Sequence, residues 1–399
     1  MDEHAKLARI AELQQELAKV NDLDLLLEKT LTLARECTGA DAGSVYIRDG
    51  GRLVFSHTQN ETLRRRLPEG KKLVYQTFTI PIDSGSIAGC VAQKGRVLNI
   101  PDAYAIPPSA PYHFNPEFDR LADYRTLSLL TAPLITSNRE TVGVLQLINA
   151  TDAGGVRRAF RADDVVLVDA FAGVAALALE RAQMTRALIL RMIRLAGLRD
   201  PKETEGHVNR VGLFAVEIYE RWARRRSLSE HEIEHNRDLL RMAAMLHDVG
   251  KVGIPDAILK KPGRLDAAEF DVMKQHTVIG AGVFGSSHSA LDAAAAEVAL
   301  CHHENWDGSG YPGRGGEGEN TSVRGVVGEN IPIFGRIVAV ADVYDALCSK
   351  RVYKDAMAGD EAVALIKADS GRKFDPEVVA AFLDCVDQLP GLAARYAGS

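Results

Sequence analysis

The sequence lacks long apolar runs, paired cysteine motifs and any surplus of basic residues. No uninterrupted hydrophobic stretch approaches the roughly 18–20 residues that a membrane-spanning helix needs. The first twenty residues are charged and amphipathic, which is not the pattern of a secretory signal peptide. The five cysteines are odd in number and contain no CxxC pair, which favours reduced thiols over a disulfide framework. We therefore expect a cytoplasmic protein without a membrane span.

The balance of charge limits the partners that the chain can have. It carries 48 basic and 54 acidic residues, a formal net charge of −6 at pH 7. Proteins that coat duplex nucleic acid usually show a basic domain, so we do not expect such a partner. Any phosphate chemistry must therefore rest on a few local cations or on metal ions. The length of 399 residues predicts two or three domains.

The first part of the chain, residues 21–180, has the pattern of an α+β domain. Amphipathic helices are expected at 2–20, ahead of this domain, and at 23–39 within it. The segment 44–57, with its Asp-Gly-Gly turn, predicts a β-hairpin. Further strands are expected at 77–82, 96–100, 128–135 and 141–150.

A single long helix is predicted over residues 163–198, ending near Pro201 because proline disfavours helix in the residue before it. Mostly apolar residues recur along it at steps of four and three: Leu167, Phe171, Val174, Ala178, Arg181, Thr185, Leu188, Met192 and Leu195. A heptad of this length is typical of a seam between two subunits, and packing on its own domain is the alternative. We expect a homodimer through this connecting helix.

The rest of the chain, residues 199–399, is helical in pattern and carries ionisable side chains of the metal-ligating kinds. The candidates are Glu203, His207, His247, Asp248, His276, His302, His303 and Asp342. Glu203 and His207 are spaced i, i+4 and would share one helix face. A lone histidine on a helix is more often a satisfied surface or core residue than a ligand. So many at such positions nevertheless argue for a shared site, and imidazole with carboxylate suits Fe, Mn or Zn better than Ca or Mg.

Two pairs of these candidates are adjacent, His247-Asp248 and His302-His303. Adjacent side chains on a helix diverge by about 100°, so one ion would find them an awkward pair. We expect each pair to serve two different ions, with Asp248 bridging them. Centres with two ions roughly 3.5–4 Å apart hydrolyse phosphate esters.

At this point the residues carry a resemblance to a known family. HDVGK at 247–251 resembles the signature of the HD phosphohydrolases, and HHENWDGSGYP at 302–312 resembles that of the HD-GYP subfamily, phosphodiesterases of cyclic di-GMP. The similarity runs collinearly through about residues 195–390. It implies an all-α domain with two or three divalent ions, usually iron or manganese. It also implies a hydrolase that converts cyclic di-GMP into the linear dinucleotide, GMP or both.

The resemblance also implies roles for single residues. The metal ligands would be His207, His247, Asp248, His276, His302, His303 and Asp342, and Glu203 would mark a third ion. His247, Asp248 and Lys251 would form the catalytic set. The substrate would be held by Lys251, Arg351, Lys354, Gly310, Tyr311 and Pro312. The Gly-rich residues 313–330 are longer than in the subfamily, which points to loop mobility or a protein partner at the Gly-Tyr-Pro loop rather than to altered chemistry.

The α+β part resembles a GAF domain, a small-molecule sensing fold, most clearly in AGCVAQKGRVLNIPDA at 88–103. GAF domains that bind cyclic nucleotides carry Asn-Lys, then Phe, then Asp-Glu. At these positions the chain has Asn149-Ala150, Phe160 and Asp164-Val165, so the Lys and the final Glu are missing. A GAF domain that senses an unidentified ligand and controls the enzyme, and a ligand-free dimerisation domain, both stay open.

The function has two further alternatives. One is a catalytically silent receptor that binds a nucleotide or a partner protein through the same surface. The other is a phosphodiesterase of a hybrid cyclic dinucleotide such as cyclic GMP-AMP, because no residue separates guanine from adenine.

Overall fold

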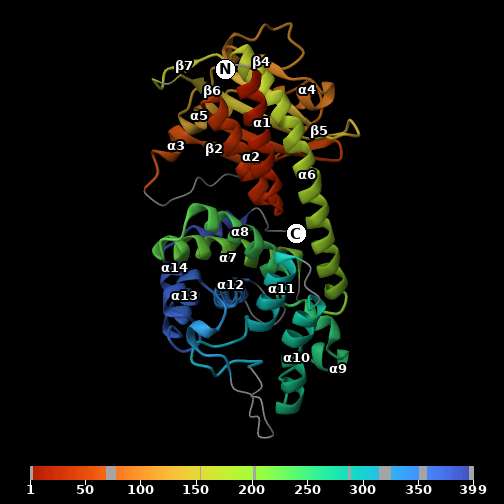
Figure 1. Ribbon diagram of the computed structural model, residues 1–399, viewed down its shortest axis with the longest axis vertical. Helices are drawn as coiled ribbons and strands as arrows, with labels where there is room; N and C mark the ends of the chain where they lie inside the picture. Colours follow the sequence, from red (N-terminus) through yellow and green to blue (C-terminus); the bar gives the residue numbers. More distant parts are fainter. Residues whose placement is uncertain are drawn as a thin grey trace. The chain divides into compact units, whose positions relative to one another are not determined.

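The computed structural model of the chain describes residues 3–68, 78–152, 154–200, 204–285, 289–313, 325–349 and 357–394. The chain divides into two compact units, Met1–Arg186 and Ala187–Ser399 (Figure 1). The division falls inside helix α6, Ala162–Gly197, so one continuous helix belongs to both units. Each unit has a hydrophobic core of its own.

The first unit opens with the two expected helices, α1 (Glu3–Ala18) and α2 (Leu23–Thr38). Asp22 caps α2, because its carboxylate accepts hydrogen bonds from the backbone N–H groups of Asp24 and Leu25. Gly39 follows the helix with a φ of 67°, the left-handed conformation that glycine adopts without a Cβ clash. Both helix predictions are therefore confirmed.

Antiparallel strands form the centre of this unit. In the described residues they are β1 (Ala40–Asp49), β2 (Arg52–Asn60), β3 (Thr79–Pro81), β4 (Leu98–Ile100), β5 (Leu129–Ile135), β6 (Thr141–Thr151) and β7 (Arg157–Arg158). The strand order is β3-β2-β1-β6-β5-β4, with β7 paired to β6. Short helices connect them: α3 (Glu61–Arg64), α4 (Ile87–Lys94), η1 (Ala103–Ala105) and α5 (Glu117–Ala122). The expected hairpin is β1-β2, and the predicted α+β class is confirmed.

Both faces of the sheet are covered, because successive side chains of a strand point to opposite sides. Val45 and Leu145 belong to the core under α1, α2 and α6 (Figure 1). Their neighbours Tyr46 and Val144 belong to a second cluster with residues of α4. The sheet is thus a central layer between helices.

Helix α6 confirms the predicted continuous helix, and the subunit seam along it stays a prediction. Leu167 and Phe171 are two residues of the predicted seam; both are buried, and Phe171 belongs to the core of the first unit. The helix uses this face to cover its own sheet, the alternative that the sequence left open. Large apolar side chains on it or just after it remain exposed, and two of them, Leu188 and Leu195, belong to the predicted seam. They are Val166, Leu177, Met184, Leu188, Leu195 and Leu198.

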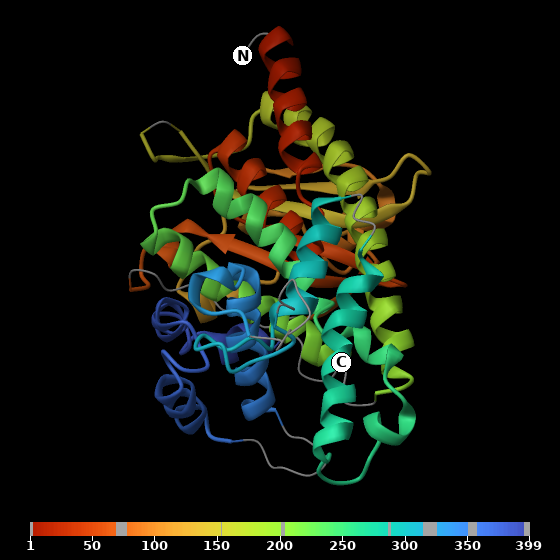
Figure 2. The ribbon, with the colours of Figure 1, turned by 60° about the horizontal axis from the view of Figure 1, so that its bottom comes forward.

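The described part of the second unit is built from helices, as predicted. They are α7 (Glu205–Arg225), α8 (Glu230–Met245), η2 (Val249–Gly253), α9 (Asp256–Leu259), α10 (Ala267–Val283), α11 (Ala290–Cys301), η3 (Gly328–Asn330), α12 (Ile333–Cys348), α13 (Gly359–Ala368), α14 (Pro376–Leu383) and α15 (Leu389–Ala393). Helix α7 packs on α8, α12 and α14, while α11 packs on α8, α10 and α12 (Figure 2). Among the described helices, none combines the length and the apolar character needed to cross a bilayer.

The residues that match the cyclic-nucleotide pattern of GAF domains face the protein interior. Asn149 is fully buried; its Oδ1 accepts from the N–H of Leu127 at 2.7 Å, and its Nδ2 donates to the Tyr124 hydroxyl at 2.9 Å. Phe160 is buried in the core, and Asp164 pairs with Arg158 at 2.6 Å. These contacts give the three side chains structural roles, and nucleotide binding by this unit stays a prediction.

Asn149→Ala should destabilise the first unit, because it leaves the buried Leu127 N–H without its acceptor. We expect a loss of about 1–3 kcal/mol in the free energy of unfolding. Hydrogen exchange of the β5 and β6 amides, followed by mass spectrometry, measures it. Asn138→Ala, in an exposed turn, is the control and should change little. Equal protection of the β5 and β6 amides from hydrogen exchange in Asn149→Ala and Asn138→Ala would contradict the structural role of Asn149.

Candidate metal centre

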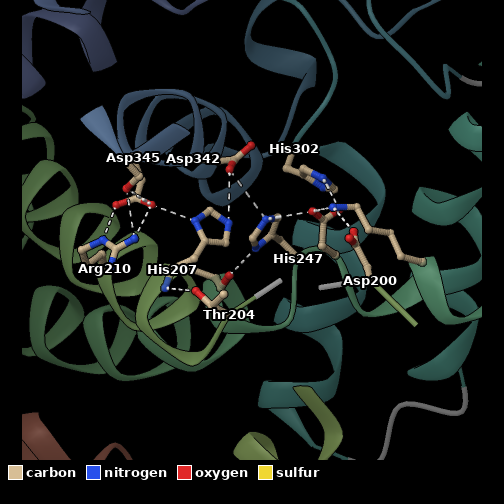
Figure 3. A network of polar contacts seen from close by, with 12 residues as sticks. Asp200, Thr204, His207, Arg210, His247, His302, Asp342 and Asp345 are labelled. Carbon is tan, nitrogen blue, oxygen red and sulfur yellow. Dashed lines mark hydrogen bonds and ion pairs between the residues drawn. The ribbon is translucent and has the colours of Figure 1, made fainter. Parts of the chain in front are cut away.

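Seven of the eight predicted metal ligands come together in the second unit. His207 lies on α7, His276 on α10 and Asp342 on α12. The others follow the ends of α8 and α11: His247, Asp248, His302 and His303. Helices far apart in the sequence thus direct their imidazoles and carboxylates to one place, which Figure 3 shows for His207, His247, His302 and Asp342.

The seven side chains form two groups. Asp248, His276, His302 and His303 make one group, and His207, His247 and Asp342 make the other; within each, the ligand atoms lie within 4.8 Å of one another. In the second group, Asp342 Oδ1 lies 3.6 Å from His207 Nε2 and 3.9 Å from His247 Nε2. Ligand atoms held about 2.1 Å from one ion stand roughly 3–3.5 Å apart, so both groups have the spacing of a slightly open ion site.

Asp248 joins the two groups. Its Oδ1 lies 3.2 Å from His276 Nε2 and 3.6 Å from His302 Nε2, in the first group. Its Oδ2 lies 3.4 Å from His247 Nε2, in the second group. One carboxylate therefore faces both groups, which is the geometry expected of a bridging ligand.

The two pairs of adjacent candidate ligands differ in how they are divided between the groups. His247 and Asp248 reach different groups, whereas His302 and His303 fall in the same group, with ring centroids 4.1 Å apart. Helix α11 ends at Cys301, so the 100° divergence within a helix does not govern these two residues. Helix α8 stops at Met245, and Gly250 lies in the following segment η2. A Cβ on Gly250 would collide with the His276 carbonyl, so only glycine lets η2 approach α10.

Hydrogen bonds fix how three of the histidines present their rings. Nδ1 of His247 donates to the Ala244 carbonyl at 2.8 Å, that of His276 to Met273 at 2.8 Å and that of His302 to Val298 at 3.0 Å. A carbonyl oxygen only accepts, so each Nδ1 carries the proton. In the neutral ring, Nε2 then offers its lone pair to the centre.

The chemistry of the donor set fits divalent cations. Within the described residues, Asp248 Oδ1 and the Nε2 atoms of His276 and His302 are buried and make no hydrogen bond. Burial lowers the pKa of His302, and burial together with His302 lowers the pKa of His303 well below its ordinary value. The two rings are therefore neutral near pH 7, as metal ligands must be. Buried lone pairs without donors would be costly unless a cation occupied the space between them.

The charge of Asp248 is secured by its neighbours. Burial alone raises the pKa of a carboxyl group, but Lys251 and His247 outweigh it and hold the pKa of Asp248 well below its usual value. The Lys251 ammonium contacts Asp248 Oδ2 and lies 3.4 Å from Asp200 Oδ2. A cation thus stands directly beside the shared carboxylate.

Sequence reasoning missed the residues that orient His207. Its Nδ1 donates to Asp345 Oδ2 at 2.8 Å, and Arg210 binds both oxygens of the same carboxylate, at 2.6 and 3.0 Å (Figure 3). Burial raises the pKa of Asp345, but His207 and Arg210 reverse this and lower it. The spacing in the sequence was the available signal, because Asp345 follows Asp342 by less than one turn of α12.

The end of α6 reaches the same centre through two further residues that were missed. Arg199 donates to the Ile254 carbonyl at 2.9 Å and pairs with Asp256 at 2.7 Å. Asp200 is buried and contacts Lys251. The connecting helix is thereby tied to the segment that carries Lys251.

The Gly-Tyr-Pro loop lies beside the first group of ligands. The N–H of Tyr311 donates to the His303 carbonyl at 3.1 Å, and the two rings are 4.8 Å apart. The Tyr311-Pro312 peptide bond is cis. Glu304, another residue missed from the sequence, is buried and accepts hydrogen bonds from the N–H groups of Gly313 and Val326. Glu304 thus links Gly313, at the start of the Gly-rich insertion, to Val326, near its end.

Three predicted site residues, Glu203, Arg351 and Lys354, lie outside the described residues, as does most of the insertion 313–330. Helix α7 begins at Glu205 with Thr204 as its N-cap. The predicted i, i+4 relation of Glu203 and His207 therefore stays a prediction.

Comparison with known proteins finds two domain families. The model described as HD domain matches residues 172–378, and the model described as GAF domain matches residues 22–179.

Curated relatives match about half of the chain. A "Cyclic di-GMP phosphodiesterase" of Vibrio cholerae serotype O1 is 43% identical over 213 residues, covering 52% of this chain and 41% of the relative. A protein of the same name from Thermotoga maritima is 43% identical over 207 residues, covering 52% and 51%. A "3'3'-cGAMP-specific phosphodiesterase 2" of Vibrio cholerae is 42% identical over 193 residues, covering 48% and 33%. The chain thus spans a third to a half of the length of these relatives.

Asp345→Asn should weaken metal binding, because the amide no longer holds the His207 ring in its orientation with a charged acceptor. Loss of such an orienting partner typically reduces metal affinity about 10- to 100-fold. Competition of the full-length chain with a chelator for Mn²⁺ measures the change. Asp384→Asn removes a surface ion pair with Arg225 and is the control. Wild-type affinity in Asp345→Asn would refute the orienting role.

Proposed function

Because the chain belongs to the HD domain family, we propose that it is a metal-dependent phosphodiesterase that hydrolyses cyclic di-GMP. The observation that carries this proposal is the position of Asp248, whose two oxygens each face one group of buried imidazoles. Such an arrangement suits two divalent ions sharing one carboxylate, the kind of centre that cleaves phosphate esters.

The chain's own residues have distinct tasks in this proposal. Divalent ions bound here would supply a water of lowered pKa and neutralise negative charge on the phosphate. Asp248 is kept ionised by its neighbours and can serve both groups at once. The Lys251 ammonium beside it would donate to a phosphate oxygen, with Arg351 and Lys354 proposed as further phosphate contacts. Iron or manganese suits the imidazole-rich set, and Glu203 would mark a third ion.

The names of relatives guide the choice of substrate. Two relatives at 43% identity are named cyclic di-GMP phosphodiesterases, which favours that dinucleotide, with the linear dinucleotide or GMP as product. A hybrid cyclic GMP-AMP is the second candidate, because a relative at 42% identity is named as specific for it.

We also propose that the GAF domain regulates this centre through α6. The contacts of Arg199 and Asp200 support the idea, since they join the end of that helix to Ile254, Asp256 and Lys251. A shift of α6 would change the surroundings of the cation that stands beside Asp248. The ligand of the GAF domain is not identified by its side chains.

We propose in addition that the chain forms a homodimer through α6. The apolar side chains that this helix leaves uncovered include Leu188 and Leu195, which are 53% and 65% exposed. Leu177, Met184, Leu188 and Leu195 follow one another at steps of seven, four and seven, the spacing of a coiled-coil seam. A second copy of the same helix would cover them.

Asp248→Ala and His303→Ala should each abolish turnover of cyclic di-GMP, a loss of at least about 1,000-fold. Asp248→Ala would remove the carboxylate shared by the two groups, and His303→Ala would remove a ligand of one group. Because only metal binding should be lost, circular dichroism should show a folded protein. Product chromatography on the anaerobically purified, metal-analysed chain measures hydrolysis of cyclic di-GMP and of cyclic GMP-AMP. His231→Ala changes an exposed histidine on α8 and should keep full activity. Hydrolysis retained in either ligand variant would sink the assignment.

Leu188→Glu should convert the dimer into a monomer, because a carboxylate in an apolar seam would lack a partner. Light scattering coupled to size-exclusion chromatography reads the mass directly. Leu121→Glu, at another exposed leucine on α5, is the matched control and should leave the dimer intact. A monomeric wild-type chain would rule out this interface.

A further inference from the structure

We infer that Phe270 and Tyr311 form a subsite that stacks one purine base of the substrate. This inference rests on the proposed function, since the base would belong to the cyclic dinucleotide whose phosphate lies at the metal centre. It assigns a recognition role to Phe270, a residue outside every motif that the sequence singled out.

A row of rings leads from the metal ligands toward the surface. The Tyr311 ring lies 4.8 Å from the His303 ring at an interplanar angle of 34° and 6.2 Å from the His276 ring. Phe270, near the start of α10, meets Tyr311 edge-on with centroids 5.9 Å apart. Phe270 therefore contacts Tyr311, whose ring in turn lies near the rings of two candidate ligands, His303 and His276. In a nucleotide one sugar separates the base from the phosphate. A phosphate at the metal centre would thus leave the base near Tyr311 and Phe270.

The two rings differ in how they are exposed. Tyr311 is half-buried, and its backbone N–H is fixed to the His303 carbonyl. Phe270 is 43% exposed, so a large apolar surface faces water directly beside a polar, metal-ligating centre. Its ring contacts Tyr311 beside the candidate metal centre, and ligand sites combine such aromatic surface with a few polar groups. A nucleobase is the fitting occupant, because its flat π face stacks on aromatic side chains.

The charge beside Phe270 suits an anionic nucleotide. The ammonium of Lys274 lies 4.9 Å from the centroid of the Phe270 ring and 2.8 Å from Asp271 Oδ1. A base against this ring would therefore bind next to a cation, and purine N7 is an acceptor for such a donor.

Calorimetric titration of the Mn²⁺-loaded full-length chain tests the subsite with two probes. GMP carries the base, and ribose 5-phosphate has the same sugar and phosphate without it. Phe270→Ala should weaken GMP binding about 5- to 100-fold, the effect of removing one stacking contact, and should leave ribose 5-phosphate unchanged. Phe270→Trp should keep the wild-type affinity for GMP. Val283→Ala, at the other end of α10 and similarly exposed, is the control and should change neither.

The outcomes separate this inference from the proposed function. In the assay with cyclic di-GMP, Phe270→Ala should raise KM and leave kcat nearly unchanged. Wild-type GMP affinity in Phe270→Ala, an equal loss for both probes, or a wild type that does not favour GMP would overturn the subsite. If GMP binding depends on Phe270 but the metal-loaded chain turns over no cyclic dinucleotide, the subsite stands and the proposed phosphodiesterase fails.

Discussion

The geometry of the second unit depends on one carboxylate, Asp248, that is shared between two groups of imidazoles. A buried carboxylate without compensation would take up a proton, since desolvation disfavours its charge. Lys251 and His247 prevent this, and the pKa of Asp248 is held well below its usual value. The side chain therefore stays an anion with one oxygen on each side, which brings α8, α10 and α11 to a common point.

The ends of α8 and α11 orient the imidazole rings of His247 and His302. The last carbonyls of a helix have no partner within it. Ala244 and Val298 belong to the last turns of α8 and α11, and their carbonyls accept the Nδ1 protons of His247 and His302. These imidazole bonds add to the backbone N–H groups that the two carbonyls already accept, and they turn each Nε2 lone pair inward. His207 obtains its orientation differently, from the ionised Asp345 held by Arg210.

Helix α6 serves both units with different faces and different ends. One face is buried against the sheet of the first unit, and apolar side chains such as Leu188 and Leu195 stay exposed. Beyond its end, Arg199 and Asp200 contact the η2–α9 region and Lys251. On another side of the centre, Phe270 of α10 contacts Tyr311 of the Gly-Tyr-Pro loop, which contacts His303 after the end of α11.

The sequence by itself determined the two domain types, the long helix between them and the seven candidate ligands that come together, because motifs, periodicity and residue chemistry can be read along the chain. The tertiary structure decided how the ligands divide. His302 and His303 share one group since α11 ends before them. It also decided which face of α6 is free, and that Asp345, Asp200, Glu304 and Phe270 stand near the centre. Such contacts join residues far apart in the chain, and no local pattern encodes them.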